Sequence, residues 1–196
     1  MIIRKKFKFE GSHIVRNCSS TRCAHSIHGH SYIVEVFVTS DRLDSGGMVV
    51  DFGLLKKTIG TLVDAFDHAM VFWSQDDVSY VSAMQELNMR WVKIPVNASA
   101  ENYALLFVAM FQLVLDKVNW KNGEKGVSVH SVRVHETATG YAEASLSDLL
   151  KNPVHKYLDV IKFSPGIMSE FPHSFKWENF LLPDYKWENP EPYHQV

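Results

Sequence analysis

Three histidines and a cysteine lie within the stretch "CAHSIHGHSY" at positions 23 to 32. His28 and His30 are two residues apart and lead into an apolar run, so on a strand their side chains would share one face. His13 ends an earlier alternating segment that could pair with this strand. Three converging imidazoles with an open fourth position are typical of a catalytic zinc site. A proton-handling site and a solvated loop are the alternatives, because an H-x-H pair alone indicates metal binding only weakly.

The two cysteines of the chain, Cys18 and Cys23, both lie close to these histidines. In a reducing compartment such placement favours metal binding or catalysis over a disulfide. A structural zinc is closed by four ligands, and either thiol could supply the fourth. A thiol beside a metal cation can instead lose its proton readily and act as a base. The residues alone leave both alternatives open.

Composition limits the classes of protein to which the chain can belong. Its 196 residues predict one domain with an appendage, and 46% hydrophobic and 21% charged residues are ordinary for a globular protein. A net charge of -2 argues against nucleic acid or an anionic membrane as the main partner. The sequence lacks an apolar run long enough for a bilayer, and its basic N-terminus lacks a signal-peptide core. We therefore expect a cytoplasmic protein.

Periodicity predicts the elements that must position these residues. Four segments have strand character: residues 2–13, 28–39, 127–136 and 140–145. Asp51 can cap a helix whose apolar stripe ends at Phe66, and Ser99 can cap a second helix. Residues 67–98 are mixed, with one short helix. The order ββααββ predicts an α+β domain with an antiparallel four-stranded sheet.

The C-terminal segment differs from the rest of the chain. Six of the seven prolines lie between Pro153 and Pro192. The segment is nevertheless rich in Phe, Trp and Tyr, which disordered tails usually lack. We predict a domain over residues 1–146 and an irregular aromatic arm over residues 147–196, packed on the domain or on a neighbouring subunit.

Five motifs in order, "FKFEGSH", "C-x4-HGH", "GGMVVDFGLLK", "DH" and "HET", resemble the 6-pyruvoyltetrahydropterin synthase family over residues 7–145. The short cysteine-to-HGH spacing is most similar to the bacterial 6-carboxytetrahydropterin synthases of the queuosine pathway. The resemblance implies the tunnelling fold, with three subunits closing a barrel and two such trimers forming a hexamer. It also implies active sites at the subunit interfaces.

The resemblance assigns roles to particular residues. The positions that match the family's zinc ligands are His13, His28 and His30. Cys23 matches the cysteine that abstracts a proton, and Asp67 with His68 matches the proton-relay pair. Without the resemblance, Asp67 and His68 would be interpreted as the end of the first helix, where a histidine complements the dipole.

Further matches concern substrate binding. Glu136 matches the glutamate that anchors the pterin ring, although alone it would be interpreted as a solvated hairpin residue. Ser99 and Glu101 lie in "NASAEN", which corresponds to the family's "PTSEN". Ala100 replaces a hydroxyl-bearing residue there, so any contact made by that hydroxyl is lost. Cys18 matches no known role.

The family's chemistry requires these residue types. Its substrate, 7,8-dihydroneopterin triphosphate, carries vicinal hydroxyls that zinc can polarise, and a nearby base must remove a proton. A carboxylate offers two acceptors to the guanidine-like edge of the pterin, and Arg16 or Arg22 could bind the triphosphate. We expect formation of 6-carboxy-5,6,7,8-tetrahydropterin with release of acetaldehyde and triphosphate. The alternatives are formation of 6-pyruvoyltetrahydropterin and a non-catalytic zinc-binding assembly protein.

Overall fold

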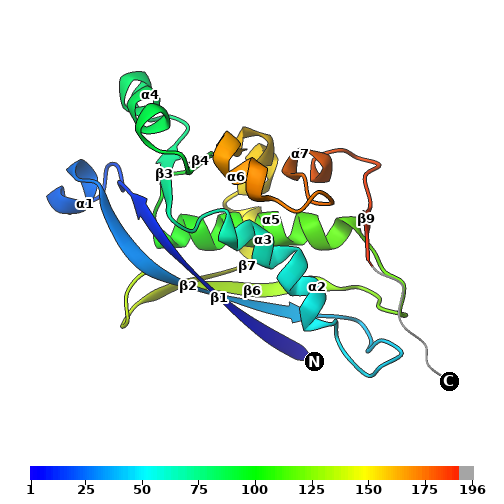
Figure 1. Ribbon diagram of the computed structural model, residues 1–196. Coiled ribbons are helices and arrows are strands. Elements are labelled where there is room, and N and C mark those ends of the chain that lie inside the picture. The colour runs from blue at the N-terminus through cyan, green and yellow to red at the C-terminus, as the bar shows by residue number, and fades with distance from the viewer. Residues whose placement is uncertain (190–196) are drawn as a thin grey trace.

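Two sheets organise the chain in a computed structural model that describes residues 1–189 (Figure 1). The strands of the large sheet are β1 (Ile2–His13), β2 (His28–Thr39), β3 (Ala69–Trp73), β4 (Trp91–Ile94), β6 (Ser128–His135), β7 (Tyr141–Ser145) and β8 (Lys162–Phe163). They lie in the order β7-β6-β2-β1-β3-β4-β8. The small sheet pairs β5 (Val118–Asn119) with β9 (Trp187–Glu188).

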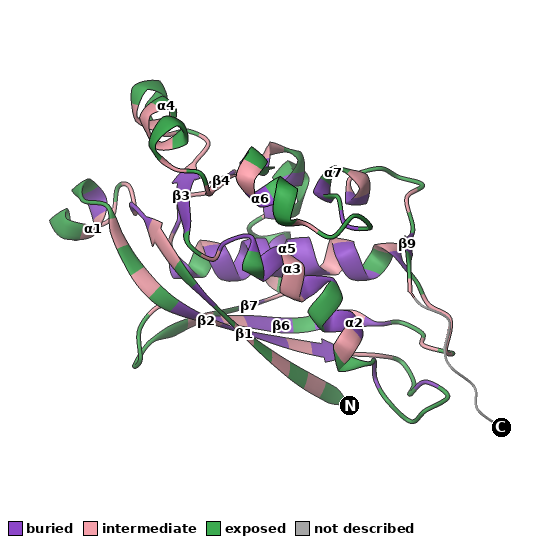
Figure 2. Cartoon of the chain, viewed as in Figure 1, coloured by how far each residue is buried: buried purple, intermediate pink, exposed green. Residues whose placement is uncertain are grey.

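The helices lie mainly on one face of the large sheet. The α-helices are α1 (Thr21–His25), α2 (Phe52–Lys57), α3 (Ile59–Asp64), α4 (Val78–Leu87), α5 (Ala100–Lys117), α6 (Pro165–Glu170) and α7 (Trp177–Phe180). Two 3-10 helices, η1 (Leu146–Leu150) and η2 (Val154–Val160), follow β7. Helix α5 runs across the sheet, and the buried residues concentrate between the two (Figure 2). The sheet and α5 therefore enclose the core.

The alternation predicted for the first strand is present, and the second predicted strand pairs with it. β1 and β2 are antiparallel, with Phe9 opposite Tyr32 and His13 opposite His28. Phe9 and Tyr32 are each 1% exposed and stack with ring centroids 4.6 Å apart. Lys8, of the opposite parity, is exposed. Burial of one parity fixes the register, because a slip of one residue would turn the apolar set toward solvent.

The α+β class is confirmed, but the predicted number of strands was wrong. The four predicted strands form the antiparallel part of the sheet, β7-β6-β2-β1. β3 and β4 extend it by parallel pairing, and β8 then pairs antiparallel with β4. These added strands are two to five residues long. Segments this short have too few residues to show the alternation of a strand. Their pairing depends on strands that are distant in the sequence.

The helix caps were predicted correctly, and the first helix is interrupted. The Asp51 side chain accepts a hydrogen bond from the Gly53 N–H at 2.8 Å, and Ser99 accepts one from Asn102 at 3.3 Å. The apolar stripe that begins after Asp51 is divided between α2 and α3 at Thr58. The buried Thr58 hydroxyl donates to the Leu54 carbonyl at 2.8 Å, a contact that often bends helices.

The aromatic residues of the arm contribute to the core of the domain. Five of them are buried there: Phe163, Phe175, Trp177, Phe180 and Trp187. β8 also extends the large sheet. The described part of the arm therefore packs on its own domain, through short helices and short strands. Residues 190–196 of the predicted arm lie outside the described residues, and the division at residues 146 and 147 stays a prediction.

Candidate metal centre and active site

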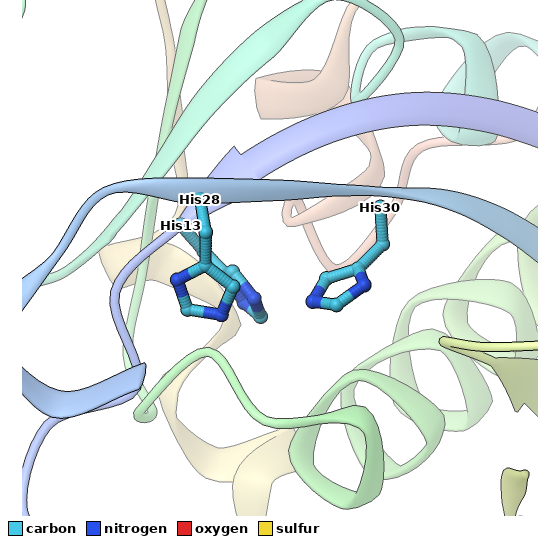
Figure 3. Close-up of side chains that lie close together, drawn as sticks. All are labelled: His13, His28 and His30. Atoms are coloured by element: carbon cyan, nitrogen blue, oxygen red, sulfur yellow. The ribbon is translucent and has the colours of Figure 1, made fainter. Parts of the chain in front are cut away.

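Three histidines converge where β1 ends and β2 begins. One ligand nitrogen from each of His13, His28 and His30 lies within 4.8 Å of the other two. The His13 ring centroid is 4.5 Å from that of His28 and 5.3 Å from that of His30. Figure 3 shows the three imidazoles on the same side of the strands. The sequence predicted this convergence, and the antiparallel register produces it.

Hydrogen bonds orient two of these rings. His13 donates from Nδ1 to the Ala98 carbonyl at 2.6 Å, just before α5 begins. His28 donates from Nδ1 to the Ser26 carbonyl at 2.9 Å. Each Nδ1–H bond leaves the lone pair of Nε2 available, which is the arrangement found around metal-binding histidines.

Burial keeps His13 neutral. Its side chain is fully buried, and burial is the largest influence lowering its pKa from 6.5 to about 4. The nearby rings of His28 and His30 lower this pKa further, whereas the hydrogen bond to Ala98 opposes the change. A neutral imidazole retains the lone pair that a metal requires. The donor set therefore fits a divalent transition metal with an open coordination position.

Glu136 lies beside the three histidines. It follows the last residue of β6, and its Oε1 lies 3.8 Å from Nε2 of His13 and 3.9 Å from Nε2 of His30. The Tyr32 hydroxyl donates to the same oxygen at 3.4 Å. The carboxylate is therefore next to the candidate metal position. Its side chain remains 31% exposed, which leaves it accessible to a ligand.

Two tyrosines at this centre were missed by sequence reasoning. Tyr32 and Tyr103 are each 1% exposed, and burial is the main cause that raises the pKa of both hydroxyls. Tyr103 also lies parallel to the His13 ring, with centroids 6.3 Å apart. Tyr32 shares the parity of His28 and His30 along β2, so the alternation could have identified it. Tyr103 could not be found in this way, because it comes from α5.

Asp67 and His68 form a hydrogen-bonded pair in the turn between α3 and β3. His68 Nδ1 lies 2.9 Å from Asp67 Oδ2, and the Glu10 N–H donates to Asp67 Oδ1 at 2.7 Å. Burial raises the pKa of the Asp67 carboxyl. Hydrogen bonds from Glu10 and His68 and the charge of Arg90 outweigh it and hold this pKa below its usual range. The carboxylate is thus ionised and fixes the His68 ring by accepting from Nδ1.

The Asp67–His68 pair lies outside the group of three metal-binding candidates among the described residues. His68 lines a hollow with Glu10, Ser31 and the cluster residue His30, and the Glu10 and Ser31 side chains hydrogen-bond at 2.6 Å. Glu10 has the opposite parity to the β1 residue His13, so its side chain projects from the other face of the sheet. Among residues 1–189, neither member of the pair belongs to the metal-binding group. The His68 side chain is 74% exposed and therefore free to meet another molecule.

The two cysteines lie on the connection between β1 and β2. Cys23 is partly buried on α1, and its carbonyl accepts from the Val15 N–H at 2.9 Å, which ties α1 to the end of β1. Cys18 lies in the preceding loop, where its Sγ donates to the Ser20 carbonyl at 3.3 Å. Within the described chain, neither thiol belongs to the three-histidine group.

The candidate anion-binding arginines have different surroundings. Arg16 donates from Nε to Asp76 at 2.7 Å and lies 4.7 Å from the centre of the Tyr80 ring. Its charge is therefore already paired within the chain. Arg22 is exposed on α1, beside Cys23, so it is the better candidate of the two for an incoming phosphate.

Ser99 and Glu101 lie where α5 begins. The Ser99 hydroxyl caps the helix, and Glu101 is exposed in its first turn. The carbonyl of the preceding residue, Ala98, is the group that holds His13. This helix start therefore orients a candidate metal ligand. Substrate contacts by Ser99 and Glu101 stay predictions.

A sequence profile of the family described as 6-pyruvoyl tetrahydropterin synthase matches residues 2–146. The chain belongs to this family. It is therefore an enzyme of the tetrahydropterin synthase type, a class of lyases. Among the described residues, the helices are too short or too polar for any of them to cross a membrane.

Relatives in the family show how much of the chain is shared. A 6-carboxy-5,6,7,8-tetrahydropterin synthase of Helicobacter pylori strain J99 is 42% identical over 201 residues, covering 100% of both chains. An Aquifex aeolicus protein with the same name is 30% identical and covers 72% of this chain and 95% of its own. The similarity to the Helicobacter protein thus includes the C-terminal arm.

Solved structures show the same fold. A Wolinella succinogenes protein superposes with a TM-score of 0.60 at 19% identity, covering 74% of this chain and 98% of its own. The 6-pyruvoyl tetrahydropterin synthase of Caenorhabditis elegans gives 0.52 at 19% identity, covering 74% and 94%. The expected tunnelling fold is thereby confirmed. About a quarter of this chain lies outside each superposition.

Proposed function

We propose that this protein is a zinc-dependent 6-carboxy-5,6,7,8-tetrahydropterin synthase of queuosine biosynthesis. Its substrate is 7,8-dihydroneopterin triphosphate, and acetaldehyde and triphosphate are released. The observation that carries the proposal is the cluster of His13, His28 and His30 with the Glu136 carboxylate beside it. The 42% identity to the full-length Helicobacter synthase supports this choice of product.

Each side chain has a defined task in this proposal. Bound zinc would supply a Lewis acid toward the hydroxyls of the substrate side chain. The Glu136 carboxylate accepts hydrogen bonds from the guanidine-like edge of the pterin and so fixes its orientation. Cys23 removes the proton from the activated carbon as a thiolate. His68 then transfers protons, with its tautomer fixed by Asp67.

A complete site in this proposal requires more than one subunit, in a hexamer built from two trimers. His68 of the Asp67–His68 pair is 74% exposed on its own chain and so can meet a neighbour. Among residues 1–189, β1 pairs with β3 only at Gly11 and Ser12, so the edge of its first part is unpaired within the described part of the single chain. Such an edge is normally covered. Light scattering should therefore give a hexamer, and a stable monomer at micromolar concentration would contradict the assembly.

Product identification tests the reaction itself. The zinc-loaded protein is incubated with 7,8-dihydroneopterin triphosphate, and the products are identified by mass spectrometry. We expect 6-carboxy-5,6,7,8-tetrahydropterin together with acetaldehyde and triphosphate. Release of triphosphate with 6-pyruvoyltetrahydropterin as product would establish the alternative synthase. Bound zinc without turnover would support a non-catalytic assembly protein.

A further inference from the structure

Arg90 connects the turn that carries Asp67 and His68 to the C-terminal arm. This arginine directly precedes β4, and its Nε donates to the Asp67 carbonyl at 2.8 Å. Its Nη2 donates to the Asp64 carbonyl at 2.9 Å, and its Nη1 pairs with the carboxylate of Glu170. One guanidinium therefore binds two backbone groups of the turn and one side chain of the arm.

The turn needs such support. His68 has a φ of 52°, in the left-handed region, which costs about 1 kcal/mol or more for a residue with a Cβ. Glu10 holds the turn from β1, where its carbonyl accepts from the His68 N–H at 2.6 Å and its N–H donates to Asp67. Arg90 holds the same turn from the opposite side. The backbone that presents His68 is thus fixed between β1 and the arginine.

The arm holds Glu170 in place independently of Arg90. The Ser164 N–H donates to the Trp91 carbonyl at 3.0 Å, and its hydroxyl caps α6 by accepting from Ile167 at 3.2 Å. Ile167 is 1% exposed in the core. A Cβ at Gly166 would lie 2.6 Å from the Met89 carbonyl, so α6 approaches the segment before Arg90 closely. Helix α6, which ends at Glu170, is therefore anchored on its own.

We infer that the C-terminal arm positions the proton-relay pair, with Glu170 acting through Arg90 on the turn of Asp67 and His68. The inference rests on the relay role proposed for that pair. The Arg90 side chain is long and loses rotamer freedom when it binds the two carbonyls. The carboxylate of Glu170 fixes one end of the guanidinium, so its remaining donors are already oriented toward the turn. Arg90 and Glu170 are positioning residues and need not touch the substrate.

The test compares Glu170→Gln and Arg90→Met with the native enzyme. Glu178→Gln is the matched control, because Glu178 is an exposed carboxylate of the same arm. Amide hydrogen exchange is followed by mass spectrometry in peptides covering residues 64–70, with peptides from β2 as reference. We expect exchange in the turn to be up to about fivefold faster in Glu170→Gln, because loss of a partly exposed ion pair changes a local opening equilibrium by about this factor. Arg90→Met, which also loses charged hydrogen bonds to two carbonyls, should give about tenfold or more.

Kinetics and the conservative variant complete the test. A displaced relay should lower kcat with KM nearly unchanged, and Glu170→Asp should recover part of the native rate. Unchanged exchange at 64–70 in both variants overturns the inference, as does an equal effect of Glu178→Gln. If Arg90→Met does not fold, Glu170→Gln decides. The exchange measurement needs no turnover. If the native protein itself shows no turnover, faster exchange in the variants would refute the proposed function and leave the support of the turn by the arm intact.

Discussion

Most of the bound zinc, and the activity with it, should be lost when His28 is replaced by alanine. The ring has one nitrogen held by the Ser26 carbonyl and lies within the cluster of His13 and His30. Its removal leaves two histidine nitrogens, too few for a catalytic zinc site with three protein ligands. The affinity should fall by more than the roughly 10–100-fold that loss of an outer-shell partner costs. Metal analysis after dialysis measures the zinc bound per chain.

His25→Ala is the matched control for this experiment. His25 is an exposed histidine at the end of α1 and lies outside the three-histidine group among the described residues. This variant should bind about as much zinc as the native protein and keep the pterin product. Equal zinc content in His28→Ala and the native protein would contradict the metal assignment. Loss in both variants would indicate that α1 itself belongs to the site.

Turnover should fall by about 10²–10⁴-fold in Cys23→Ala, while zinc and the fold are retained. The thiol belongs to α1, which is tied to the end of β1 by the contact between Val15 and the Cys23 carbonyl. That contact uses the backbone, so alanine preserves it. The loss is then confined to the group proposed to remove the proton. Steady-state kinetics with zinc-loaded protein gives the ratio of rates.

Cys18→Ala is the control for Cys23→Ala. It tests whether the loss of turnover is specific to Cys23 or follows removal of either thiol. The Cys18 side chain contacts the Ser20 carbonyl in the loop, so its removal should change the rate by far less. The double variant Cys18→Ala/Cys23→Ala should still hold zinc. Loss of most zinc from it would show a closed thiolate site and refute the catalytic interpretation. A native rate of turnover in Cys23→Ala would indicate that Cys23 is not the base and that His25 or His68 has this role.

The sequence alone determined the three-histidine cluster and the two strands that carry it. Strand alternation places His28 and His30 on one face, and the antiparallel partner ends at His13. These are local properties, because a period of two residues decides which side chains share a face. The caps at Asp51 and Ser99 were predicted for the same reason, since a cap depends only on the next few residues.

Only the tertiary structure decided how residues far apart in the sequence come into contact. The backbone around Asp67 and His68 is fixed by Glu10 from β1 and by Arg90 from the segment before β4. The arm adds Glu170, which is 80 residues from Arg90 in the chain. The pairing of the extra strands β3, β4 and β8 also joins segments that are far apart in the sequence. Contacts between residues far apart in the sequence depend on which surfaces pack together. A local pattern of residue types does not predict this packing. The three-histidine cluster was therefore predictable, whereas the support of the turn of Asp67 and His68 required the folded chain.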